Sequence, residues 1–417
     1  MATISKQNRS AILAKNVSTI SALLLLLLLL NTVFTQGTAL IKGNVPFAVG
    51  FKTLLLSDNS RKFRFKDQVH AVSRPIRLFV WYPGTKANTT RPLRFEDYVY
   101  ASNLKKDSDQ LTSLEKENLR NKVTETLGYF EVTREQIAHL LAAEVNATSN
   151  VPAKNGKFPL LVFGNAGEGF YFFSMAESLA SNGYVVVSLP SIGATEGESC
   201  GFDLLCLKLQ QEDIEFAINK TSDLPNVDAS RIGLLAWSFS GLAIAQIQTK
   251  NSNVKAVVSL DSATGYKYGK DILDQSNEFD PSKTNVPFLH VHGLGGSSRV
   301  PKDFSYFNAV RSKNKSLVTF KNLQHSDFVS LYGDGMRFAK KTNGATVTED
   351  LCWVDRITLE FLNAHLKDDL KSSKFLDDLS QCKGKPSVVG FTLLNPPLHG
   401  PRKSFFEIIC GLGRSGF

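Results

Sequence analysis

The chain has 417 residues, of which 42% are hydrophobic, 21% charged and 10% aromatic. This composition is typical of a globular protein with a large core and excludes a largely disordered chain. The net charge of +9 is a mild excess, and no block of Lys and Arg interleaved with aromatic residues accompanies it. We therefore expect no nucleic-acid partner.

The first 37 residues have the features of a secretory signal peptide. Lys6, Arg9 and Lys15 precede a run of leucines at residues 23–30, and small residues follow as far as Gly37. The apolar run is shorter than the ~20 residues that span a bilayer. Cleavage near Gly37 is therefore favoured over an uncleaved anchor. The mature protein is expected to be secreted and to contain no integral membrane span.

Two further features agree with a secretory route. The expected mature region contains four Asn-X-Ser/Thr glycosylation acceptors, at Asn88, Asn146, Asn219 and Asn314. The second half contains five cysteines, an odd number, at Cys200, Cys206, Cys352, Cys382 and Cys410. A Cys200–Cys206 disulfide would close a small loop, and Cys352 with Cys382 would tie the C-terminal helix region to the tail. Free buried thiols are the alternative for either pair.

The remaining chain alternates between strand and helix patterns. Apolar, β-branched runs predict strands at residues 47–56, 76–82, 158–163, 184–189, 232–237, 254–260, 286–291 and 317–320. Helical spacing predicts helices at residues 171–181, 203–219, 241–250, 302–312 and 355–370. This order predicts an α/β fold with an antiparallel pair of strands and then a mostly parallel, doubly wound sheet.

Residues 95–150 interrupt this alternation with a more charged segment. Apolar residues near helical spacing predict one helix, at Leu111, Leu114, Leu119, Val123 and Leu127, and a capping box at residues 133–136 opens a second. The two helices predict an inserted helical cap, with a surface hairpin as the alternative. The predicted organisation is a signal peptide at 1–37, one domain at 38–370 with the insertion at 95–150, and a C-terminal tail at 371–417.

The segment around Ser238 has the pattern of a nucleophile elbow. An apolar strand runs into Ser238, and a helix pattern follows it. The usual G-x-S-x-G pattern has Ala236 and Ser240 at its glycine positions, and Gly241 stands one place later. Alanine and serine are the next smallest residues, so the sharp turn remains sterically possible. An ordinary helix-capping serine is the alternative interpretation.

Two further residues complete a Ser, Asp, His order along the chain. Asp261 ends the strand after the elbow, and His325 follows the last parallel strand. Residues at the carboxyl edge of such a sheet meet in space, and this order is that of a Ser-His-Asp triad on an α/β-hydrolase fold. Asp303, in the loop after the strand at 286–291, and Asp327, beside His325, are the alternative acids. His290 and His292 alternate along a buried strand and are expected to be core residues or supporting neighbours of the site.

The remaining candidate site residues lie in two glycine-rich or aromatic segments. The oxyanion hole is predicted from the backbone N–H of Phe239 and from Ala166 or Gly167 in the loop after the strand at 158–163. Phe170, Tyr171 and Trp237 are candidates for contacting substrate. No G-K-S/T or G-x-G-x-x-G pattern indicates a nucleotide site, and no cysteine has a metal-ligand spacing with histidine. Neither a cofactor nor a metal is expected.

The sequence resembles platelet-activating-factor acetylhydrolases and dienelactone-hydrolase-like esterases of the α/β-hydrolase superfamily. The resemblance runs over residues 45–370 and rests on the segments at 74–83, 158–165 and 179–187, the elbow, and the surroundings of Asp261 and His325. It implies catalytic roles for Ser238, Asp261 and His325. Where that family has His-Gly in the oxyanion loop, this chain has Asn165 and Ala166.

These patterns predict a secreted serine hydrolase of carboxylic esters that acts on a small-molecule or lipid ester through an acyl-enzyme. The main alternative is a non-catalytic binding protein with an α/β-hydrolase fold, which the altered elbow favours. A third interpretation is a lipase that acts at lipid surfaces and whose site is covered by the insertion.

Overall fold

The computed structural model of the protein describes residues 46–85, 91–128, 132–149, 151–198, 200–276, 279–295, 300–330, 344–381 and 388–393. The predicted signal peptide, the acceptor Asn88, and Cys382 and Cys410 lie outside these residues. The expected pairing of Cys352 with Cys382 therefore stays a prediction. The disulfide between Cys200 and Cys206 is present and confirms that expectation.

A single, mostly parallel sheet forms the centre of the fold in the described residues. Its strands are β1 (Ala48–Phe63), β2 (Val72–Gly84), β3 (Pro92–Arg94), β4 (Glu144–Ser149), β5 (Phe158–Gly164), β6 (Val185–Leu189), β7 (Val227–Trp237), β8 (Val254–Leu260), β9 (Phe288–Gly293), β10 (Lys315–Phe320) and β11 (Val388–Leu393). The 11-stranded sheet has the order β11-β10-β9-β8-β7-β5-β6-β2-β1-β4-β3. The six strands from β6 to β10 in this order are parallel, and β1 and β2 pair antiparallel, as predicted.

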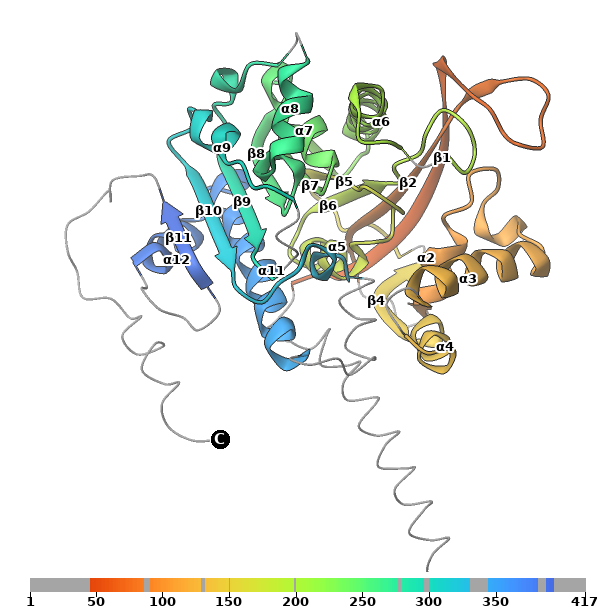
Figure 1. Cartoon of the computed structure of the whole chain (residues 1–417). Coiled ribbons are helices and arrows are strands. Elements are labelled where there is room, and N and C mark those ends of the chain that lie inside the picture. Colours follow the sequence, from red (N-terminus) through yellow and green to blue (C-terminus); the bar gives the residue numbers. More distant parts are fainter. Residues whose placement is uncertain are drawn as a thin grey trace, which may run out of the picture. The chain divides into compact units, whose positions relative to one another are not determined.

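Helices cover both faces of this sheet. They are α2 (Phe95–Tyr100), α3 (Ser113–Gly128), α4 (Arg134–Ala142), α5 (Phe173–Ser181), α6 (Leu204–Ser222), α7 (Ser240–Lys250), α8 (Lys267–Asp274), α9 (Ser305–Ala309), α11 (Gly344–Leu366) and α12 (Leu370–Gln381). Helices α6 and α7 lie on one face, and α5 and α11 lie on the other (Figure 1). The buried strands between them are rich in Val, Leu and Ile because both of their faces are covered.

Two predicted helices have different bounds in the structure. The helix expected at 302–312 is only the short α9. The helix expected at 355–370 begins earlier and ends at Leu366, and Asp368 in the break before α12 has a φ of 55°. A non-glycine residue in the left-handed region interrupts the helical backbone, so α12 starts in a new direction. β11 pairs with β10, which places part of the expected C-terminal tail in the sheet.

The insertion forms an additional layer beside β1. β4 pairs with β1, β3 pairs with β4, and α2, α3 and α4 pack on one another. The capping box that opens α4 is formed by Thr133 and Gln136, as predicted. Of the expected apolar stripe on α3 and the residues before it, Leu111, Val123 and Leu127 are buried, whereas Leu114 is 67% exposed.

The insertion is joined to the rest of the sheet through the buried Glu177 of α5. Its carboxylate accepts hydrogen bonds from the hydroxyl of Tyr98 in α2 (2.6 Å) and from the backbone N–H groups of Asn146 and Ala147 in β4 (both 3.2 Å). Burial raises the pKa of Glu177 to about 7, despite these donors. A titratable carboxyl therefore lies at the junction of the insertion and α5.

Candidate active site

Ser238 occupies a sharp turn between β7 and α7. β7 ends at Trp237, α7 begins at Ser240, and Ser238 between them has a φ of 60°. This left-handed conformation is strained for a residue with a Cβ, and such strain is concentrated at functional sites. The turn lifts the side chain of Ser238 out of the strand at the carboxyl edge of the sheet. This is the geometry expected of a nucleophile elbow.

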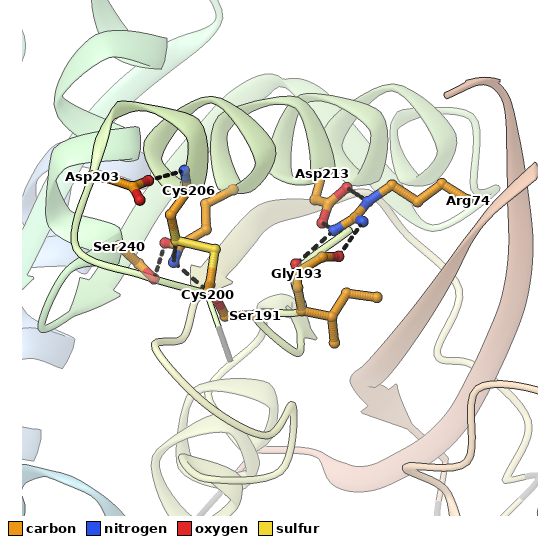
Figure 2. Close-up of a disulfide and its surroundings, with 10 residues drawn as sticks. Arg74, Ser191, Gly193, Cys200, Asp203, Cys206, Asp213 and Ser240 are labelled. Carbon is orange, nitrogen blue, oxygen red and sulfur yellow. Dashed lines mark hydrogen bonds and ion pairs between the residues drawn. A yellow bond between two sulfur atoms is a disulfide. The ribbon is translucent and has the colours of Figure 1, made fainter. Parts of the chain in front are cut away.

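The structure gives a steric reason for the residues that depart from the glycine pattern. Ala236 is fully buried and pairs with Gly164 of β5, so a small side chain fits at this position. A Cβ on Gly241 would lie 2.1 Å from Oγ of Ser262, so glycine is required one place later than the pattern puts it. Ser240 fits because its Oγ donates a 2.6 Å hydrogen bond to Oε1 of Gln210 in α6 (Figure 2).

The three residues of the predicted triad lie in hydrogen-bond contact. Nε2 of His325 is 3.0 Å from Oγ of Ser238, and Nδ1 of the same ring is 2.7 Å from Oδ2 of Asp261. Asp261 directly follows β8, and His325 lies at the start of a 3-10 turn after β10. The side chain of His325 is 41% exposed, whereas Ser238 is 6% exposed and Asp261 is 1% exposed.

Asp261 is held by more than its contact with His325. The backbone N–H of Gly293 donates to Oδ1 at 3.1 Å, the hydroxyl of Tyr266 donates to both oxygens at 3.0–3.1 Å, and Nδ1 of His292 lies 2.7 Å from Oδ1. Burial alone would raise the pKa of Asp261, but the contacts with His292 and His325 outweigh it and hold this pKa below the ordinary value. The group is therefore a buried carboxylate anion at neutral pH.

The two alternative acids and His290 contact groups other than the three triad residues. Asp303 accepts from the backbone N–H of Ser305 at 2.8 Å, and Asp327 accepts from that of Gln324 at 2.7 Å. Both carboxyl groups therefore cap local turns. His290 is buried with Nδ1 2.7 Å from Oγ of Ser259, and burial lowers its pKa to about 3. This neutral histidine belongs to the packing beneath the site.

Trp237 was expected to contact substrate, but it lies against His325. Its indole ring stacks on the imidazole with a centroid separation of 4.6 Å and an interplanar angle of 22°, and its Nε1 donates to the backbone carbonyl of His325 at 2.9 Å. Only 7% of Trp237 is exposed. The contact that the structure shows for Trp237 is therefore with His325, and its contact with substrate stays a prediction.

The two segments expected to form an oxyanion hole and a substrate wall are also located. Phe239 precedes the first turn of α7, so its N–H is among the donors that a helix leaves without an internal partner. Ala166 and Gly167 lie in the loop after β5, and Gly167 accepts from the N–H of Ser191 at 2.9 Å. Phe170 is 1% exposed and packs on Phe79 and Phe95, and it borders a cavity beside α3, so its contact with substrate stays a prediction.

Tyr171 stays a candidate at a different place. It is partly buried and lines a cavity between α3 and the end of this loop, together with Leu119, Val123 and Glu168. The same cavity is bordered by an ion pair of 2.5 Å between Lys122 of α3 and Glu168. The insertion therefore reaches the end of the expected oxyanion loop through α3.

Two residues of the site were not identified from the sequence. Gln210 carries no motif and contacts Ser240 from 30 positions away in the chain, and Tyr266 lies five positions after Asp261 without a motif that marks it. His292 was expected only as a core or supporting residue, and its position one residue before Gly293 was the available signal. In the part of the chain that the structure describes, no group of His, Cys, Asp and Glu side chains is arranged to hold a metal ion.

Comparisons with known proteins support the fold. No protein-family model matches the chain, and no curated protein matches its sequence. Its structure matches that of a ferulic acid esterase from Streptomyces cinnamoneus with a TM-score of 0.54, 17% sequence identity, and coverage of 79% of this chain and 93% of that chain. At this identity the likeness shows the fold alone. The predicted α/β-hydrolase fold with a mostly parallel sheet is confirmed.

Proposed function

We propose that this protein is a serine hydrolase that cleaves carboxylic esters with Ser238, His325 and Asp261 as its catalytic triad. The observation that carries the proposal is the continuous set of contacts from Ser238 at the strained elbow through His325 to the buried Asp261. Both distances are within hydrogen-bond range without any movement of the side chains. A serine that only caps a helix does not require a histidine and a buried carboxylate in hydrogen-bond contact with it.

In this mechanism His325 Nε2 accepts the proton of Ser238 as Oγ attacks the ester carbonyl carbon. The Asp261 carboxylate keeps the proton on Nδ1 and stabilises the imidazolium that forms. The N–H of Phe239 and an N–H of Ala166 or Gly167 hold the carbonyl oxygen as it becomes an oxyanion. His325 then gives the proton to the departing alcohol. Water attacks the acyl-enzyme by the same steps and releases the acid.

The protein is proposed to act outside the cytosol. The predicted signal peptide, the glycosylation acceptors and the disulfide of Cys200 and Cys206 all favour an oxidising secretory route. Asn146 and Asn219 are exposed, as glycan attachment requires. None of the helices in the described ranges is long and apolar enough to cross a membrane.

The steric fit of Ala236, Ser240 and Gly241 removes the main argument for a non-catalytic binding protein, since the altered elbow keeps the required turn. The resemblance to acetylhydrolases and dienelactone-hydrolase-like esterases, together with the fold shared with a ferulic acid esterase, supports an ester as the substrate. Ser238→Ala tests the proposal directly. The variant should lose hydrolysis of p-nitrophenyl acetate and keep the circular dichroism spectrum of the parent. A fully active Ser238→Ala protein would refute it.

A further inference from the structure

A covalently closed turn lies beside the elbow. The disulfide links Cys200 to Cys206, six positions apart in the sequence, and closes the turn into a ring. Asp203 within the ring accepts a 2.8 Å hydrogen bond from the N–H of Cys206 and thereby caps the start of α6 (Figure 2). A short ring that also caps a helix has few conformations available to it. The side chains that it carries are therefore held in place.

The chain leading into this turn is fixed to the sheet as well. Ser191 donates its N–H to the carbonyl of Gly167 in the expected oxyanion loop at 2.9 Å. The fully buried Arg74 donates to the carbonyls of Ile192 and Gly193 at 2.9 and 2.7 Å and pairs with Asp213 of α6 at 2.6 Å (Figure 2). The segment is thus anchored next to the proposed oxyanion donors and at the helix that follows the turn.

This rigid turn presents large apolar side chains to solvent. Phe202 is 68% exposed and Leu205 is 65% exposed. The ring of Phe202 packs edge-on against Phe239 with centroids 5.5 Å apart, and Tyr268 lies on another side at 6.0 Å. Phe239 is the residue directly after Ser238. Exposed apolar side chains that gather on one turn are candidates for contact with an apolar ligand.

We propose that Phe202, held by the disulfide-closed turn at residues 200–206, is a specificity-determining residue that binds the apolar part of the ester. The inference rests on the proposed function. A substrate whose carbonyl carbon lies at Ser238 Oγ has its acyl or alcohol group within reach of a side chain that packs on the next residue. Because the turn is already ordered, binding costs little conformational entropy. The preferred substrates are therefore esters with an extended apolar group rather than acetates.

The test compares p-nitrophenyl octanoate with p-nitrophenyl acetate, both kept monomeric so that adsorption to aggregates does not contribute. Phe202→Ala should lower the octanoate-to-acetate ratio of kcat/KM by about tenfold or more, chiefly through a higher KM for octanoate, as is typical when apolar contacts are removed from a pocket. Phe202→Leu should give an intermediate ratio and provides a second variant if alanine impairs folding. Leu370→Ala removes a side chain that is 82% exposed on α12 and is the matched control.

The outcomes separate this inference from the proposed function. A parent protein that hydrolyses esters through Ser238, combined with unchanged ratios in both Phe202 variants, would refute the role of Phe202 and leave the serine mechanism standing. A parent protein that hydrolyses neither ester would refute the proposed function and this inference with it. A ratio that falls equally in Leu370→Ala would assign the effect to general loss of apolar surface and would also overturn the proposal.

Discussion

Replacing Asp261 by asparagine should abolish most activity without changing the shape of the site. The N–H of Gly293 and Nδ1 of His292 face Oδ1, and the hydroxyl of Tyr266 approaches both oxygens, whereas Nδ1 of His325 faces Oδ2. The backbone N–H of Gly293 is a donor that cannot change its role. The asparagine carbonyl therefore takes the position of Oδ1, and its NH₂ group points at His325.

An NH₂ group in that position forces Nδ1 of His325 to accept a hydrogen bond, which places the ring proton on Nε2. In this tautomer His325 cannot accept the proton of Ser238. A loss of the correct tautomer lowers kcat by on the order of 10⁴ in a Ser-His-Asp triad, which corresponds to about 5.4 kcal/mol in the activation free energy. The assay is the initial rate on p-nitrophenyl acetate for Asp261→Asn beside Asp303→Asn and Asp327→Asn, whose carboxylates cap local turns. A larger loss in either control than in Asp261→Asn would refute the reasoning.

Two further predictions concern positions that support the site and the insertion. Trp237→Leu removes both the ring stacked on His325 and the donor to its carbonyl, so kcat should fall about tenfold or more with little change in KM. Trp237→Phe keeps an aromatic ring and should recover part of this rate. Equal rates in the two variants would contradict a role of Trp237 in orienting His325. Burial raises the pKa of Glu177 to about 7, above the ordinary value of 4.5, so its contribution to the free energy of unfolding is present at low pH and is lost as the pH rises through 7. The measurement is the free energy of unfolding in urea for the parent and for Glu177→Gln from pH 4.5 to 8. The variant should gain stability relative to the parent by up to about 3 kcal/mol as the pH rises. A difference in stability that is constant with pH would exclude this titration.

The strands and the positions of the candidate site residues were predictable because their signals are local. Each of Ser238, Asp261 and His325 comes directly after an apolar run or close to its end, and the carboxyl ends of parallel strands meet at one edge of a sheet. The bounds of β8 agree with the prediction at both ends. By contrast β3 and β4 are short and lie in a charged segment, so the sequence showed only the helices of the insertion.

The orientation of aromatic residues could not be predicted in the same way. The run from Phe170 to Phe173 is aromatic throughout, and only the contacts with Phe79 of β2 and Phe95 of α2 show that Phe170 is buried. Trp237 lies next to Ser238 in the chain, which suggested contact with substrate. Its actual partner, His325, is 88 positions away, and a stacking contact over that distance leaves no pattern in the sequence.

Ser240 illustrates how a tertiary contact changes the meaning of a motif. As a sequence pattern it weakens the elbow, because glycine is expected there. In the structure its hydroxyl donates to Gln210 of α6, and the amide of Gln210 donates in turn to Oγ of Ser191 at 2.8 Å. The departure therefore links the elbow to the loop that carries the disulfide. Glycine at this position would lack the hydroxyl that makes this link.

Labelling with a fluorophosphonate probe, followed by peptide mapping, tests the central claim most directly because the probe reacts only with an activated serine. The parent protein should carry one adduct, on Ser238, and Ser238→Ala should carry none. His325→Ala should also label much more slowly, since the serine then lacks its base. An unlabelled parent protein, or an adduct on a different serine that persists in Ser238→Ala, would contradict the assignment of Ser238 as the nucleophile.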